Sequence, residues 1–119
     1  MKICVPTMGD RGLDEMVSAH FGRAPTFTII DMATNEVRVL RNESEHFGGA
    51  GHPPELLANT GADVLVCSGL GPRAITMFEH SGIEVYVGAS GTVNEIIKAF
   101  QKGMLQEATN ENACKEHRH

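Results

Sequence analysis

The second half of the chain alternates strand and helix patterns, and this alternation restricts the fold more than any other feature. Residues 64–67 form a near-continuous apolar run, which is typical of a parallel strand covered on both faces. A glycine-rich turn and a predicted helix ending near His80 follow, and residues 83–87 form a second apolar run. Residues 92–95 have the spacing of a capping box and open a second helix, which ends at Gly103. This order predicts an α/β domain with parallel strands.

The first half predicts three more strands, at 3–5, 26–31 and 37–42. Residues 26–31 are rich in β-branched and aromatic side chains, and the alternating segment 37–42 follows after a short turn, so the two form an antiparallel hairpin. Right-handed crossovers leave the other four strands roughly parallel and the second one antiparallel. We therefore expect a single mixed five-stranded sheet with one antiparallel strand, flanked by about three helices, of which the first is short and covers 55–59.

Length, charge and cysteine count exclude several classes of protein. The 119 residues predict one domain, spanning 1–105, because the segment 106–119 is polar and typical of a flexible tail. A formal charge of -5, with five Phe, one Tyr and no Trp, argues against nucleic-acid binding. No apolar stretch is long enough for a membrane span or a signal peptide. The odd count of three cysteines favours a reducing compartment, so we expect a cytoplasmic protein.

The predicted topology brings four loops to one edge of the sheet, where the parallel strands end: 7–25, 43–52, 68–71 and 88–91. Open α/β sheets bind ligands at this edge. Three of these loops are glycine-rich and lead into helices, so their backbone N–H groups and the positive ends of helix dipoles are expected to converge on an anion site. The alternative is that these glycines only form tight turns before the helices.

The segment Ser18-Ala19-His20-Phe21-Gly22-Arg23-Ala24, followed by a strand, resembles the S-x-H-F-G-R-A signature of the dinitrogenase iron–molybdenum cofactor biosynthesis family. Later segments also fit the spacing of that family, so the resemblance covers about residues 2–105. They are Gly51, Gly61-Ala62-Asp63-Val64, Gly69-x-Gly71-x-x-Ala74, Gly82-Ile83-x-Val85-Tyr86 and Thr92-Val93.

The resemblance implies a ribonuclease-H-like α/β fold of about five strands without the nuclease carboxylates. It also implies that relatives carry or store precursors of iron–sulfur–molybdenum cofactors, and that one relative binds an anionic molybdenum–copper sulfide cluster without covalent attachment.

The candidate cofactor-binding residues come from the motif and the four loops. They are Ser18, His20, Gly22, Arg23, Gly49, Gly51, His52, Gly69, Gly71, Arg73, Gly91 and Thr92. Alternatively, Ser18 and His20 only cap local turns, with Phe21 anchoring the loop, and Arg23 is solvated.

Soft-metal ligands are the second group of candidates. His20 could ligate a metal, as could Cys67 at the end of the fourth predicted strand. For Cys67 we favour the alternative of a small buried hydrophobe. Cys114, His117 and His119 place one thiol and two imidazoles in the tail, which allows transient metal capture.

The first long loop also contains three carboxylates, which could form a hard-metal site or a catalytic acid pair. The spacing of Asp10, Asp14 and Glu15 matches no calcium loop, and we interpret them as solvated charges. We therefore expect a non-enzymatic protein that binds and carries or stores an anionic metal–sulfur cluster or cofactor precursor. The cluster would be of the Fe–S, Mo–Fe–S or Mo–Cu–S type, held reversibly at the edge where the strands end.

Two other functions stay open at this point. One is a regulatory or interaction module that partners a cluster-assembly ATPase or an acceptor protein. The other is a small enzyme acting on an anionic metabolite, with His20 as acid or base. The exposed edge strand at 37–42 is compatible with a monomer or a weak dimer, because charges such as Arg38 and Arg41 discourage edge pairing.

Overall fold

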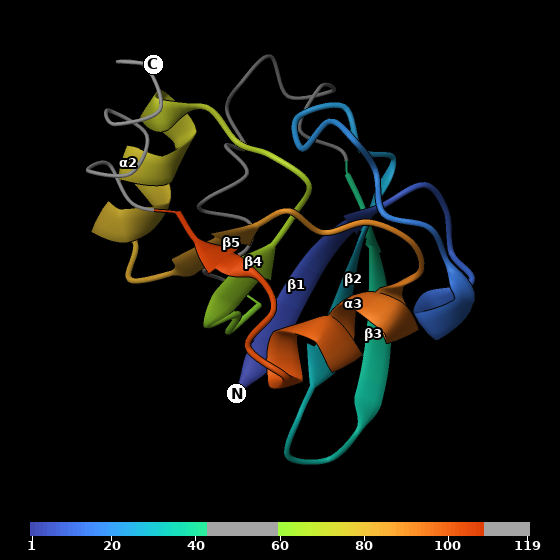
Figure 1. The fold of residues 1–119 in the computed structure, drawn as a ribbon. Helices are drawn as coiled ribbons and strands as arrows, with labels where there is room; N and C mark the ends of the chain where they lie inside the picture. Colours follow the sequence, from blue (N-terminus) through green and yellow to red (C-terminus); the bar gives the residue numbers. More distant parts are fainter. Residues whose placement is uncertain (43–59, 109–119) are drawn as a thin grey trace.

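The computed structural model describes residues 1–42 and 60–108 of the chain (Figure 1). Together they form one six-stranded sheet, two α-helices and a short 3₁₀ helix. The strands are β1 (Lys2–Thr7), β2 (Thr26–Asp31), β3 (Glu36–Arg41), β4 (Val64–Val66), β5 (Glu84–Val87) and β6 (Gln106–Glu107). The helices are η1 (Gly12–Asp14), α2 (Pro72–His80) and α3 (Val93–Gln101).

The strand order is β3-β2-β1-β4-β5-β6. β2 is antiparallel to both β1 and β3, whereas β4 is parallel to both β1 and β5. β1, β3, β4 and β5 therefore point the same way, which confirms the predicted directions. The prediction of five strands with one antiparallel member is wrong, because β6 pairs antiparallel with β5 through Tyr86 and Glu107 and through Val87 and Gln106. β6 has two exposed residues and no apolar alternation, so the sequence carries no strand signal there.

β1 continues through Pro6, where the sequence predicted a stop. Proline is rare in central strands because it has no N–H to donate to a neighbour. The parallel pairing of β1 with β4 covers Ile3 and Cys4, so Pro6 lies beyond it while still facing Phe27 of β2. The Pro6 carbonyl oxygen accepts a hydrogen bond from the Ser18 N–H at 2.8 Å, which attaches the first long loop to the end of the strand.

The two α-helices cover opposite faces of the sheet. Ile75 and Phe78 of α2 pack in one core with Cys4 and Leu65, whereas α3 packs in a second core with the strand residues of opposite parity. The buried α3 residues are Val93, Ile96 and Ile97. One face of each strand therefore feeds each core, which explains the near-continuous apolar runs of the central strands.

Both helices end as the sequence predicts. Gly82 (φ +77) follows α2, and the Ile83 N–H donates to the Phe78 carbonyl oxygen at 2.9 Å in a Schellman motif. Gly103 (φ +71) follows α3, where the Met104 N–H donates to Ala99 in the same way. The third predicted helix, 55–59, lies outside the described residues, and the implied ribonuclease-H-like arrangement stays a prediction.

No α-helix among residues 1–42 and 60–108 has the length or the apolar character that crossing a bilayer requires.

Candidate functional site

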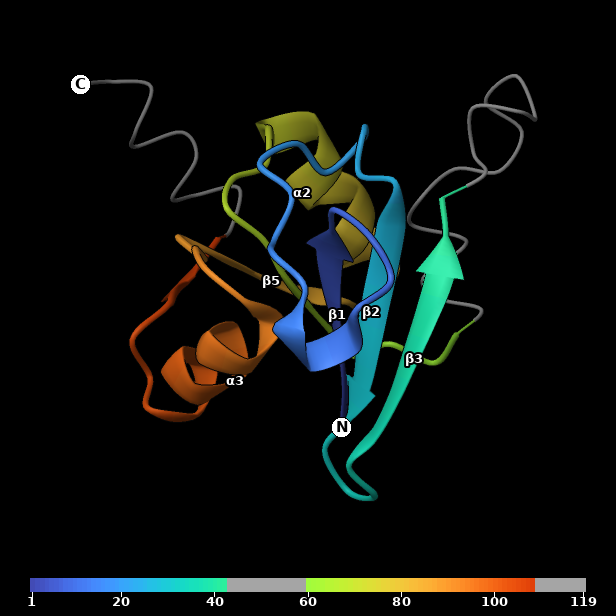
Figure 2. The ribbon, with the colours of Figure 1, turned by 90° about the vertical axis from the view of Figure 1, so that its right-hand side faces the viewer.

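The parallel strands deliver three described loops to one edge of the sheet. These loops follow β1, β4 and β5 and cover residues 8–25, 67–71 and 88–92. The fourth predicted loop, 43–52, lies outside the described residues. Figure 2 shows the blue segment after β1 running from η1, beside α3, up to the level of α2. The first loop therefore reaches from one helical layer to the other across the end of the sheet.

A pocket of about 520 Å³ lies between this loop and the start of α2. It contains five of the predicted site residues: His20, Gly22, Arg23, Gly69 and Gly71. Its other lining residues are apolar, and no aspartate or glutamate is among those described. They are Ala19, Phe21, Leu70 and Ala74. Sequence reasoning missed this apolar wall, although Ala19, Phe21 and Ala74 stand within the family-like motifs.

Residues 18–25, which we call the pocket loop, are anchored at the centre of the segment and at its first turn. Phe21 is buried, with its ring 5.4 Å from that of Phe27 and 5.3 Å from that of Phe78, the latter in an edge-to-face arrangement. The buried Ser18 hydroxyl donates to the His20 carbonyl oxygen at 3.0 Å and accepts from the His20 N–H at 3.3 Å. Ser18 therefore caps the local turn, which is the alternative that the sequence left open. It supports the loop through these hydrogen bonds and does not line the pocket.

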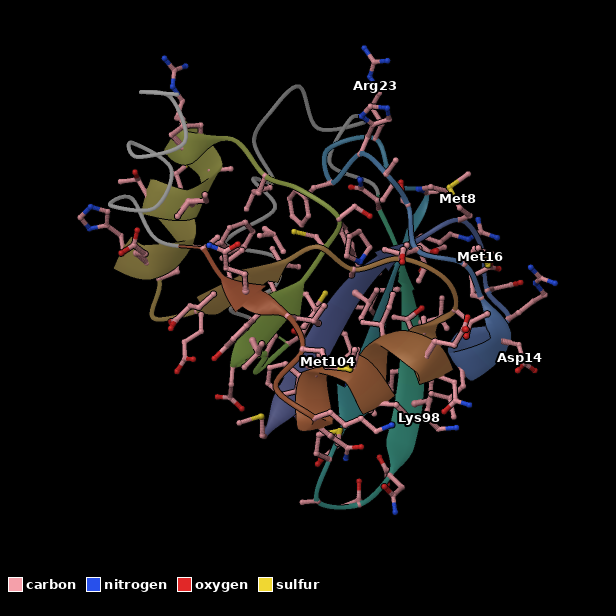
Figure 3. All side chains as sticks on the ribbon, in the orientation of Figure 1. Met8, Asp14, Met16, Arg23, Lys98 and Met104 are labelled. Carbon is pink, nitrogen blue, oxygen red and sulfur yellow. The ribbon has the colours of Figure 1, made fainter. Side chains whose placement is uncertain are left out.

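The side chains of His20 and Arg23, on either side of the buried Phe21, are exposed. His20 and Arg23 both line the pocket, and Figure 3 shows Arg23 extending outward from the loop into solvent. Arg73, at the second position of α2, is also exposed but is not among the lining residues. The pocket therefore has an apolar floor and positive charge at its rim.

No side chain in the described part of the chain caps the N-terminus of α2, which lies beside the pocket. Gly71 occupies the N-cap position, where it supplies no side chain to cap the helix, and the first turn contains no acidic residue. Pro72 has no N–H, and within the described residues we find no acceptor for the N–H groups of Arg73 and Ala74. The helix dipole adds partial positive charge at this end, so the terminus attracts an anion.

The N-terminus of α3 is closed. The Thr92 hydroxyl accepts from the Glu95 N–H at 3.2 Å, and the Glu95 carboxylate accepts from the Thr92 N–H at 2.9 Å, so the predicted capping box is confirmed. The Val93 N–H donates to the Glu15 carbonyl oxygen at 2.9 Å. The Gly91 carbonyl oxygen accepts from the Val17 N–H at 3.0 Å.

These contacts correct the expected convergence of glycine loops. Gly91 and Thr92, which we predicted as cofactor-binding residues, do not line the pocket and instead join α3 to the segment 15–17. Of the two described glycine loops, only Gly69–Gly71 faces the pocket. The physical reason is that Thr92 and Glu95 already satisfy the N–H groups that an anion would need.

Glu15 also departs from expectation. It is buried, not solvated, and its carboxylate lies 3.3 Å from the Arg11 guanidinium. Hydrogen bonding from Arg11 and then from the Met16 N–H lowers the pKa of Glu15. The spacing of four residues between Arg11 and Glu15 was the available signal for this pair. Glu15 therefore holds the loop together and offers nothing to a ligand in the pocket.

The two described cysteines behave as core residues. Cys4 and Cys67 are 0% and 1% exposed, and burial raises the pKa of Cys67 to about 12. Burial, followed by the proximity of Cys67, raises the pKa of Cys4 as well. Both thiols are neutral near pH 7, whereas a metal requires the thiolate. The structure therefore supports our preferred interpretation of Cys67 as a small buried hydrophobe.

In the described part of the chain, no three His, Cys, Asp or Glu side chains are grouped to hold a metal ion. His20 is the only described pocket-lining residue whose side chain is a good metal ligand. Several predicted site residues lie outside the described residues. They are Gly49, Gly51, His52, Cys114, His117 and His119.

The fold and the pocket define a small α/β domain with a ligand-sized pocket beside the N-terminus of one helix. Its sequence matches the family model "Dinitrogenase iron-molybdenum cofactor" over residues 1–103. The chain belongs to this family, as the motif at 18–24 predicted.

Individual relatives agree with this assignment. An uncharacterized protein of Methanocaldococcus jannaschii is 30% identical over 112 residues, which cover 90% of this chain and 91% of the relative. The apo form of the orange protein from Desulfovibrio gigas has a similar structure, with a TM-score of 0.81 and 32% identity over 90% of this chain and 92% of that one. A putative NifB protein from Thermotoga follows with a TM-score of 0.72 and 32% identity, covering 89% of this chain and 91% of that one.

Proposed function

We propose that the protein binds and carries or stores an anionic metal–sulfur cluster, or a precursor of one, in the pocket between residues 19–23 and the start of α2. The observation that carries the proposal is the open N-terminus of α2, which faces a lining without a described acidic side chain. Membership in a cofactor-biosynthesis family supports a cargo of the iron–sulfur or molybdenum–sulfur type. The same reasoning favours a carrier over an enzyme.

The chemistry of the lining favours a sulfide-rich anion over an oxyanion. Sulfide ligands spread negative charge over a large, polarisable surface that is weakly hydrated, so contact with Phe21, Leu70 and Ala74 costs little desolvation. The N–H groups at the start of α2 can donate to the sulfides, Arg23 adds positive charge, and the His20 imidazole can donate a hydrogen bond. A phosphate or molybdate ion would lose strong hydration against the same wall.

The pocket also suits reversible binding. Because His20 is the one good metal ligand among the described lining residues, the cluster would keep its own sulfide ligands and bind through hydrogen bonds and charge. No covalent bond to the protein then has to break on release. A carrier that transfers its cargo to another protein requires this property.

Titration with tetrathiomolybdate, followed by equilibrium dialysis and visible absorption, tests the proposal. We expect the wild type to retain the chromophore and the double variant His20→Ala/Arg23→Ala to bind about 30-fold more weakly, because the two contacts contribute about 1 kcal/mol each and about 2 kcal/mol together. The control is His80→Ala/Arg38→Ala, which removes the same side-chain types from exposed positions outside the pocket. No retention by the wild type, or equal affinity of the two double variants, would contradict the proposal.

Competition separates a sulfide site from a general anion site. Molybdate and phosphate should displace tetrathiomolybdate only at concentrations far above its own, because they gain nothing from the apolar wall. Equal competition by molybdate would show that the pocket binds any small anion, and the assignment of a metal–sulfur cargo would then fail.

A further inference from the structure

Asn42 follows the last residue of β3 and contacts the far end of the pocket loop. Its side-chain amide donates to the Ala24 carbonyl oxygen at 2.9 Å and lies 3.5 Å from the Gly22 carbonyl oxygen. Its backbone N–H donates to the Pro25 carbonyl oxygen at 3.0 Å. The residue just after the edge strand therefore contacts residues on both sides of Arg23 in the turn.

We infer that Asn42 is a positioning residue, which sets the location of the pocket loop and thereby the affinity of the pocket for its cargo. The effect on affinity rests on the proposed function, whereas the effect on the loop does not. Neither the motif at 18–24 nor the glycine pattern indicates this role, because Asn42 is 18 residues away from Ala24 in the sequence.

The geometry demands an amide at this position. The two acceptors among the described residues are carbonyl oxygens, so the NH₂ group of Asn42 faces them. Aspartate has the same shape but would place a carboxylate oxygen against these carbonyls, which replaces attraction with repulsion. Asn42→Asp is therefore a nearly isosteric test of the hydrogen bonds themselves.

The turn needs such support because little else is buried there. Ala24 is 1% exposed and its N–H donates to the Phe21 carbonyl oxygen at 3.3 Å, whereas Gly22 and Arg23 are exposed. Phe21 anchors the middle of the loop in the core and Ser18 shapes its first turn. Asn42 supplies the corresponding restraint at the other end, next to the residues that line the pocket rim.

Amide hydrogen exchange of the full-length protein without any ligand tests the restraint. In Asn42→Asp, and also in Asn42→Ala, we expect the Ala24 N–H to exchange about fivefold faster, because one hydrogen bond of about 1 kcal/mol no longer closes the turn. The control is Asn94→Asp, which makes the same change in charge at an exposed position on α3. Unchanged exchange at Ala24 in both Asn42 variants would overturn the inference.

Tetrathiomolybdate binding tests the consequence for affinity. We expect both Asn42 variants to lose at least fivefold in affinity while their melting temperatures stay well above the assay temperature. Asn94→Asp should keep wild-type affinity. Wild-type affinity in both Asn42 variants would overturn the positioning role. If the wild type binds no tetrathiomolybdate, the proposed function fails, while the exchange data still decide whether Asn42 holds the loop.

Discussion

Thr92 and Glu95 close the N-terminus of α3 on itself: the Thr92 hydroxyl accepts from the Glu95 N–H at 3.2 Å while the Glu95 carboxylate accepts from the Thr92 N–H at 2.9 Å. At the start of α2, Gly71 provides no such side chain. Among residues 1–42 and 60–108, one helix terminus is therefore capped by its own side chains and the other has no side-chain cap. We therefore propose that the first terminus is structural and that the second binds the ligand.

Removing the cap of α3 should therefore affect stability and not binding. We predict that Thr92→Ala lowers the free energy of unfolding by about 1 kcal/mol, the usual value for a lost N-cap side chain. Urea denaturation gives this value, and dialysis with tetrathiomolybdate should give wild-type affinity. A clear loss of affinity in a folded Thr92→Ala protein would mean that α3 contributes to the site.

Acid should weaken the same capping box. Hydrogen bonds from the Thr92 N–H and hydroxyl lower the pKa of Glu95 below its ordinary 4.5. A carboxyl whose pKa is lowered by folding stabilises the protein above the ordinary value, and this contribution is lost as the pH falls through the lowered one.

We predict that the melting temperature declines as the pH is lowered below about 4.5 and that Glu95→Gln declines less steeply, because glutamine does not titrate. The comparison is made by thermal denaturation between pH 7 and pH 3. Parallel curves for Glu95→Gln and wild type would show that Glu95 contributes nothing to the acid sensitivity.

The thiols of Cys4 and Cys67 should be protected in the native protein. Because burial raises the pKa of Cys67 to about 12, only a negligible fraction is thiolate at pH 8. A Cys114→Ser variant leaves these two as the only thiols. A disulfide reagent should react with them slowly in buffer and rapidly in about 6 M guanidinium, which unfolds the protein. Rapid reaction in buffer would place Cys67 within reach of solvent and reopen its role as a soft-metal ligand.

The sequence predicted those features that strong local patterns encode. The apolar run at 64–67 indicated a doubly buried strand, the capping-box spacing indicated the start of α3, and Gly82 and Gly103 indicated the helix ends. Each depends on residues close together in the chain, where periodicity and capping chemistry act directly.

Features that depend on distant pairing were not predictable. β6 exists because Gln106 and Glu107 lie beside the edge of β5, and no apolar pattern marks them. Glu15 is buried because its segment packs beside the start of α3, which is distant in the sequence. The contact of Asn42 with Ala24 joins two segments that are 18 residues apart, and no local sequence pattern marks it.

The candidate site was predicted in part for the same reason. The motif placed His20, Gly22 and Arg23 in one loop, and the glycine turn placed Gly69 and Gly71 before a helix. That the two meet in one pocket followed from the strand directions, whereas the diversion of Gly91 to the segment 15–17 did not.

The Gly71→Asp substitution tests the central claim most directly, because it would cap α2 from within. Gly71 has φ -73 and ψ 159, which any residue adopts, and an added Cβ would meet no atom within 4 Å. Aspartate at this N-cap should accept from the N–H groups of the first turn and leave the free energy of unfolding equal to that of wild type or raised by roughly a few tenths of a kcal/mol.

Tetrathiomolybdate affinity is the decisive measurement, with Asn94→Asp as the control for added negative charge near the start of the other helix. We predict that Gly71→Asp is at least as stable as wild type and binds at least tenfold more weakly, by about 1.4 kcal/mol or more, while Asn94→Asp binds normally. A stable Gly71→Asp protein with wild-type affinity would contradict the claim that the open terminus of α2 holds the anion.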